Sequence, residues 1–152
     1  MRLWIDADAC PGAIKDVIIR AALKREMTTF FVANKIITLP DSPWLLGVQV
    51  PLGPDVVDQY IIGQAQSGDL VVSQDIPLAA ELVSRGVVVI NPHGVLFTPN
   101  NIAERLSHRN FLQEMRDSGL VTGGPKAFGD KEKRDFSNTF DQTLTRLLKN
   151  EA

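Results

Sequence analysis

Residues 3–14 read LWIDADACPGAI, and this stretch decides the fold. Its first part, residues 3–7, is mostly apolar and suits a buried β-strand, while Pro11 can open a helix in its first turn. After Pro11, apolar residues recur at helical spacing and form a stripe that packs onto a sheet: Ile14, Val17, Ile18, Ala21 and Ala22. The stretch therefore predicts a buried strand, a turn that carries two carboxylates, and a helix.

The same alternation of strand and helix continues to residue 90. Further strands are expected at residues 29–33, 48–50, 70–73 and 87–90, and further helices at 55–65 and 77–84, with Gly86 as a cap. The last of these strands is apolar without alternation, as a strand covered on both faces should be. This pattern predicts an α/β protein, a three-layer sandwich around a mainly parallel sheet.

The pattern changes after residue 91. Pro92, Gly94 and Pro99 mark a long turn, after which no strand is expected and helices are predicted at 102–118 and 130–149, joined by a loop at 122–126. Isolated amphipathic helices are marginal in water and need a core to pack on. We therefore expect a single domain over residues 1–152, with an α/β core at 1–98 and a helical C-terminal extension at 99–152.

Composition excludes several classes of protein. The 152 residues include 16 Lys and Arg, 18 Asp and Glu, and one Cys, so no internal disulfide can form and zinc motifs built on paired Cys are excluded. No basic stripe announces a nucleic-acid binder, and no run approaches the ~18 apolar residues of a membrane span. Asp6 and Asp8 stand where a signal peptide would be apolar, so we expect a cytoplasmic protein with no membrane partner.

Acidic residues fall where strands end or where the following helices begin. These are Asp6, Asp8, Asp55, Asp58 and Asp75. The carboxyl ends of parallel strands meet at one edge of the sheet, where open α/β folds bind their ligands. The sequence therefore predicts that Asp6, Asp8, Asp58 and Asp75 converge, whereas Asp69, at the start of a strand, lies at the opposite edge with a structural role.

A cluster of carboxylates without His or Cys suits Mg²⁺ or Mn²⁺, which favour oxygen ligands. Such a cation neutralises charge on phosphoryl oxygens, so hydrolysis of phosphate esters is the natural reaction. The alternative is that Asp55, Asp58 or Asp75 only caps the start of a helix. The joint placement favours the metal site, because one helix start needs at most one cap and the first strand supplies both Asp6 and Asp8.

Several motifs carry a family resemblance. WIDADACP (residues 4–11), GPDVVD (53–58), GDLVVSQDIPLA (68–79), NPHG (91–94) and TGGP (122–125) resemble the YaiI/YqxD family of bacterial proteins. That family is similar to the PIN-like superfamily, whose members hold Mg²⁺ or Mn²⁺ on acidic residues at the sheet's carboxyl edge and cut RNA. The resemblance implies a PIN-like domain in which Asp6, Asp8, Asp75 and either Asp58 or Asp55 form the catalytic and metal-binding set.

Other residues near this edge have a functional and a structural interpretation. Asn34 and Lys35 follow the second strand and are candidates to bind substrate, as is Lys126 in the glycine-rich loop; each can also be an ordinary turn or loop residue. His93 can carry a proton or contact a phosphate, but a turn residue is the simpler interpretation. Cys10 is expected to be a packed residue rather than a nucleophile.

Three functions are compatible with these residues. The first is a metal-dependent phosphodiesterase with Mg²⁺ or Mn²⁺ as cofactor. Its partner and substrate would be nucleic acid, with RNA favoured over DNA. The second is a phosphatase of the haloacid-dehalogenase type, whose Asp-x-Asp pair Asp6 and Asp8 resemble; that motif continues with Gly-Thr, whereas Ala9 and Cys10 follow here. The third is a non-catalytic, metal-binding interaction module.

Overall fold

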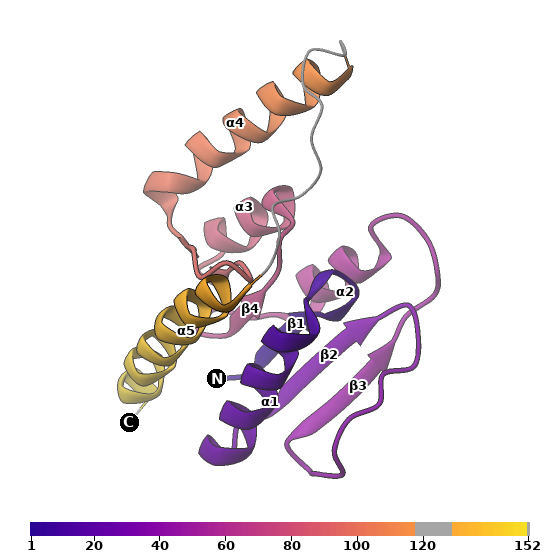
Figure 1. The fold of residues 1–152 in the computed structure, drawn as a ribbon, viewed down its shortest axis with the longest axis vertical. Coiled ribbons are helices and arrows are strands. Elements are labelled where there is room, and N and C mark those ends of the chain that lie inside the picture. The colour runs from indigo at the N-terminus through magenta and orange to yellow at the C-terminus, as the bar shows by residue number, and fades with distance from the viewer. Residues whose placement is uncertain (118–128, 152) are drawn as a thin grey trace.

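A computed structural model describes residues 1–117 and 129–151 of the chain. Within them, six strands form one sheet in the order β3-β2-β1-β4-β5-β6 (Figure 1). The strands are β1 (Leu3–Asp6), β2 (Thr29–Ala33), β3 (Leu45–Gln49), β4 (Leu70–Val72), β5 (Val88–Ile90) and β6 (Leu96–Phe97). All neighbouring pairs are parallel except β5 and β6. The predicted α/β architecture with a mainly parallel sheet is confirmed.

Helices cover both faces of the sheet. They are α1 (Gly12–Arg25), α2 (Val56–Gln64), α3 (Ile76–Ser84), α4 (Pro99–Asp117) and α5 (Asp130–Glu151), and a short 3-10 turn, η1 (Ala7–Ala9), follows β1. Helices α1 and α5 pack on one face, and α2 and α3, with the start of α4, pack on the other. In the described part of the chain, no helix combines the length and apolarity that crossing a membrane requires.

Alternation along β1 explains why both faces are covered. Leu3 and Ile5 point into the cluster under α1 and α5, whereas Trp4 points into the cluster under α2 and α3. All three are at most 1% exposed. A strand that is apolar on both sides must lie in the middle of the sheet, and β1 does so, between β2 and β4.

Helix α5 is an integral part of the core. Phe136 and Phe140 are stacked with ring centroids 5.1 Å apart and are at most 1% exposed, so replacing either with Ala should cost about 3 to 5 kcal/mol. The helix approaches Gly94 so closely that a Cβ there would lie 2.6 Å from the backbone of Asp135, and Gly94 has a φ of +88°. Gly94 therefore allows α5 to dock against the turn after β5.

Two expectations about strands were wrong. No strand was expected after residue 91, but β6 pairs with β5 through a tight turn held by the side chain of Asn91. A strand of two residues is too short to show the alternation of apolar and polar residues that marks a strand. Only the turn at Asn91 could have indicated it. The third strand, expected at 48–50, is β3 at Leu45–Gln49. It is an edge strand, and because its first half contains exposed positions and Gly47, that half does not resemble a buried apolar strand.

Candidate functional site

The order of the strands reverses direction at the end of β1. From β1 the chain moves through β2 to β3 on one side of the sheet, and then crosses through α2 to β4 on the other side. In open parallel sheets ligands bind outside the carboxyl ends of the two strands where this reversal occurs. Asp6 ends β1, and Ser73 and Asp75 follow β4, so all three lie at this point of reversal.

Asp6 is a buried carboxylate held by a serine. It is 7% exposed, and its Oδ2 accepts a hydrogen bond of 3.1 Å from the Ser73 hydroxyl. Burial raises the pKa of Asp6, the Ser73 hydrogen bond opposes that rise, and the charges of Asp75 and Asp8 add to it. The same Ser73 oxygen accepts from the backbone N–H of Asp75 at 3.0 Å, so one side chain fixes the position of both acids.

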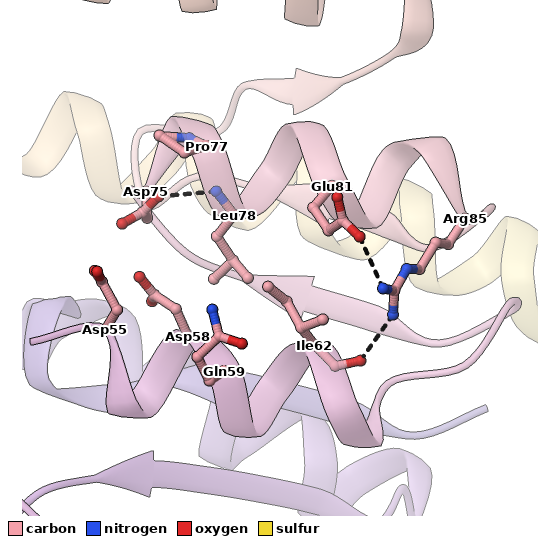
Figure 2. A pocket seen from close by; sticks show the side chains of 9 residues that line it. All are labelled: Asp55, Asp58, Gln59, Ile62, Asp75, Pro77, Leu78, Glu81 and Arg85. Atoms are coloured by element: carbon pink, nitrogen blue, oxygen red, sulfur yellow. Dashed lines mark hydrogen bonds and ion pairs between the residues drawn. The ribbon is translucent and has the colours of Figure 1, made fainter.

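Asp75 does cap a helix, as one interpretation of the sequence held. Its Oδ1 accepts from the backbone N–H of Leu78 at 2.8 Å, at the start of α3. The cap fixes the carboxyl group where Figure 2 shows it, facing the start of α2. A cap of this kind uses one oxygen and leaves the other available to a ligand, so capping and ligand binding are compatible in Asp75.

Asp58 lies in the first turn of α2 and points toward Asp75 (Figure 2). Burial raises its pKa from 3.8 to about 7, helped by a side-chain hydrogen bond to Asp75 and by the charges of Asp75, Asp6 and Asp55. Every charged neighbour in this set is another carboxyl group. The pKa is therefore raised first by burial and then by neighbouring carboxyl groups, and a cation would relieve the second of these effects.

Asp55 lies next to Asp58 but is held differently. Its backbone is left-handed, with a φ of 62°, at the residue before α2, and its side chain makes no capping hydrogen bond. It is exposed, and it shifts the pKa of Asp58 less than Asp75 and Asp6 do. Of the two residues between which the sequence could not choose, Asp58 is therefore the one that couples to the acids at the strand ends.

Asp8 is brought to the same edge by η1. It is exposed, and its Oδ2 accepts a hydrogen bond of 2.8 Å from the backbone N–H of Asn34, which follows β2. Its charge contributes to the raised pKa of Asp6. The turn itself is tied to β4, because Gln74 Nε2 donates to the carbonyl of Ala9 at 2.8 Å.

A groove runs from the acids between α2 and α3. It has a volume of about 530 Å³ and is lined by Asp55, Asp58, Gln59, Ile62, Asp75, Pro77, Leu78, Glu81 and Arg85. Figure 2 shows the three aspartates at one end and Arg85 at the other. There Arg85 pairs with Glu81 at 2.7 Å and donates to the carbonyl of Ile62 at 3.2 Å. The groove is thus strongly acidic at the end next to β1 and β4.

The remaining candidates have varied surroundings. Lys35 is exposed beside Asn34 at the carboxyl edge. His93 lies in the turn between β5 and β6, where its backbone N–H donates to Asn91, as a turn residue would. Lys126 and the loop at 122–126 lie outside the described residues. Burial raises the pKa of Cys10 to about 12, which suits a packed residue and not a nucleophile.

The acids do not form a closed metal cage as placed. Within residues 1–117 and 129–151, no three His, Cys, Asp or Glu side chains converge on one metal position. Asp69 is kept apart at the opposite edge, where it is 5% exposed and accepts hydrogen bonds from Arg2, Trp4 and Gln66. What the structure shows is five carboxyl groups close enough for their charges to raise one another's pKa values: Asp6, Asp8, Asp55, Asp58 and Asp75.

Sequence reasoning missed the residues that organise these acids. Ser73 and Gln74 were not candidates, although a serine that ends a buried apolar strand beside an Asp is a signal for a buried hydrogen bond. Arg85 and Glu81 were also missed. They follow Asp75 on α3 at positions that helical spacing would place along one side of the groove.

Known proteins of one family match nearly the whole length of this chain. The family described as "Uncharacterized BCR, YaiI/YqxD family" matches residues 4–146. The chain is 52% identical to a UPF0178 protein of Syntrophobacter fumaroxidans over 149 residues, which cover 98% of this chain and 97% of the relative. It is also 52% identical to a UPF0178 protein of Myxococcus xanthus over 151 residues, 99% of both chains. The protein thus belongs to the YaiI/YqxD family, as its strand-end motifs indicated.

Proposed function

We propose that this protein is a metal-dependent phosphodiesterase that hydrolyses nucleic acid, with RNA as the first substrate to test. The observation that carries the proposal is that Asp6, Asp58 and Asp75 belong to three separate elements and come close enough for the carboxyl groups of Asp75 and Asp6 to raise the pKa of Asp58. The resemblance of the chain to the PIN-like superfamily supports the same reaction. Mg²⁺ or Mn²⁺ is the cofactor of this proposal.

The donor set fits such a cation. Asp6, Asp58 and Asp75 offer oxygen ligands only, which hard divalent cations prefer. They come from three separate elements that the core holds together, so the fold and not local sequence sets their spacing. Because no three acids converge on one position in the described residues, at least one side chain must rotate to complete the set. Asp58 and Asp8, which are less buried than Asp6, are the candidates to move.

The chain's own residues would divide the work as follows. Asp6 and Asp75 are fixed ligands, because Ser73 holds the first and the cap of α3 holds the second. Asp58, whose pKa is about 7, is partly protonated near neutral pH and would give up that proton to a bound cation. The cation, when bound, would supply Lewis acidity to the phosphoryl group. Asn34 and Lys35, at the same edge, are assigned to contact the substrate.

The test is cleavage of a labelled, mixed-sequence RNA by the purified protein with Mn²⁺, Mg²⁺ or a chelator. Asp58→Asn and Asp75→Asn should abolish cleavage, and Asp41→Asn, an exposed acid outside the groove, should cleave like the parent. Cleavage that persists in both site variants, or that needs no metal, would overturn the proposal.

Repeating the experiment with DNA and with a phosphomonoester separates the two alternative functions. A phosphatase of the haloacid-dehalogenase type would form a phosphorylated Asp6 with a phosphomonoester substrate and would not need Asp58. A non-catalytic module would bind Mn²⁺ through the acids and leave RNA, DNA and phosphomonoesters intact. Either result would replace the phosphodiesterase assignment.

A further inference from the structure

A second groove lies between α1 and α5, the two helices on the sheet face away from α2 and α3 (Figure 1). Its volume is about 290 Å³. Its floor is apolar, formed by Val17 and Ala21 from α1 and by Phe140 and Leu144 from α5. The side chain of Ala21 is a single methyl group and therefore leaves space for the groove.

The walls of this groove carry an excess of positive charge. The cationic residues that line it are Arg20, Lys24, Arg25 and Lys133, and Asp141 is the one carboxylate among its described lining residues. Asp141 pairs with Arg25, which also donates to Thr145 at 3.3 Å. In the described part of the chain, no ion pair engages Arg20, Lys24 or Lys133, so three cations line the groove without a direct ion-pair partner.

These cations flank the groove from both sides. Arg20 and Lys24 are four residues apart on α1, which places them one helical turn, about 6 Å, from each other along one wall. Lys133 comes from α5 on the other wall. A row of cations along a channel suits a ligand whose negative charges repeat along its length, rather than a single small anion.

We propose that the groove between α1 and α5 binds the sugar–phosphate backbone of a single-stranded nucleic acid. The uncompensated cations would contact successive phosphates, and the apolar floor would pack against the sugars. A concave channel does not fit a flat membrane surface. The assignment also answers an electrostatic difficulty, because the acidic groove repels a polyanion and the chain as a whole has a net charge of −2.

The position of the groove connects it to the acidic site. Helix α1 begins at Gly12, directly after the turn that carries Asp6 and Asp8, and the groove is lined by the later part of this helix, from Val17 to Arg25, so the groove leads along α1 toward that turn. A strand bound there can extend to the acids. The statement that this strand is the substrate rests on the proposed function; the statement that the groove binds it does not.

The test measures binding of a fluorescently labelled single-stranded RNA by anisotropy, in chelator and over a range of salt concentrations. The variant is Arg20→Gln with Lys24→Gln, and the matched control is Arg146→Gln with Lys149→Gln, two exposed cations of α5 that do not line the groove. Both remove the same charge. Circular dichroism confirms that each variant is folded.

Losing two phosphate contacts should lower the slope of log affinity against log salt by about 1.4. That slope corresponds to binding about 25-fold weaker at about 0.1 M salt. The control should keep the slope of the parent. Equal slopes and affinities in the two double variants would overturn the proposal, and so would failure of the parent to bind RNA.

Failure of this assignment and failure of the proposed function are distinguishable. If RNA binds through the groove in chelator but is not cleaved when Mn²⁺ is added, the groove stands and the phosphodiesterase does not. If Mn²⁺-dependent cleavage occurs and the Arg20 and Lys24 double variant cleaves with an unchanged KM, the groove is wrong and the activity stands. A raised KM with little change in kcat supports both.

Discussion

The carboxyl group of Asp58 on α2 faces that of Asp75 before α3, and Asp75 raises the pKa of Asp58 through a side-chain hydrogen bond and through its charge. Two carboxyl groups make such a contact when one of them holds a proton. Asp75 is fixed by the cap of α3, so Asp58 is the partner whose pKa rises. The Asp58–Asp75 pair therefore holds a proton at the position where we propose that a cation binds.

Replacing Asp58 with Asn should stabilise the protein at high pH in the absence of metal. Folding raises the pKa of Asp58 from 3.8 to about 7, so the native state binds this proton more tightly than the unfolded chain does. The free energy of unfolding contributed by Asp58 is therefore fully present below about pH 4 and falls as the pH rises through 7. Asn has no proton to lose and escapes that loss.

Thermal denaturation in chelator measures the effect. Because Asp58 is partly exposed and screened, we expect about 1 kcal/mol, a rise in Tm of about 2 to 4 °C at about pH 8.5, and almost no rise at about pH 4. A variant whose Tm is below that of the parent at the higher pH would show that ionised Asp58 does not destabilise the native state.

Divalent cations should stabilise the parent protein, and protons should compete with them. Mn²⁺ that binds the native state raises Tm with concentration, by an amount that follows the ratio of metal concentration to Kd. Because Asp58 must lose its proton, the apparent affinity should fall as the pH drops below 7. Asp41→Asn should respond like the parent. An equal Tm rise in Asp58→Asn would place the metal elsewhere.

Asp75 should show two separable roles when Asn and Ala variants are compared. Asn keeps an oxygen that can accept from the Leu78 N–H, so Asp75→Asn should preserve the cap of α3 and change stability little. Asp75→Ala removes the cap and should lower the free energy of unfolding by about 1 kcal/mol. Both should lose Mn²⁺ binding. Denaturant unfolding separates the roles, and metal binding retained by the Asn variant would leave Asp75 a cap only.

Asp69 should behave in the opposite way to the site acids. Its carboxylate accepts from the Trp4 indole at 3.1 Å and from the Arg2 and Gln66 backbone at 3.0 Å each. Asp69→Asn leaves at least one of these buried or partly buried donors unpaired and should cost about 2 to 4 kcal/mol. Its Mn²⁺ affinity, measured below the unfolding transition, should match that of the parent. A loss of metal binding by the folded variant would contradict the assignment of a structural role to Asp69 and of metal binding to the acids at the other edge of the sheet.

Much of the fold follows from local pattern, because β1, β4 and β5 are short apolar runs followed by helix starts or turns. The sheet order is what pattern cannot supply: nothing local to β4 says that it pairs with β1 instead of β3. The layered α/β class was predictable, whereas β6 was not, because its pairing depends on the Asn91 turn.

The candidate site divides in a similar way. Asp6 and Asp75 could be found because strand ends are recognisable, and parallel strands bring their ends to one edge. Asp55 and Asp58 are three residues apart, and only the packing of α2 against α3 shows which one meets Asp75. Ser73 escaped because its role is a hydrogen bond to a residue 67 positions away.

Calorimetric titration with Mn²⁺ shows whether acids from separate elements form one divalent-cation site. At a pH above the pKa of Asp58, the parent and Asp41→Asn should bind Mn²⁺ with the same stoichiometry and affinity. Asp58→Asn and Asp75→Asn should bind it far more weakly. If all four proteins bind Mn²⁺ alike, or if the folded parent binds none, the account of this site is wrong.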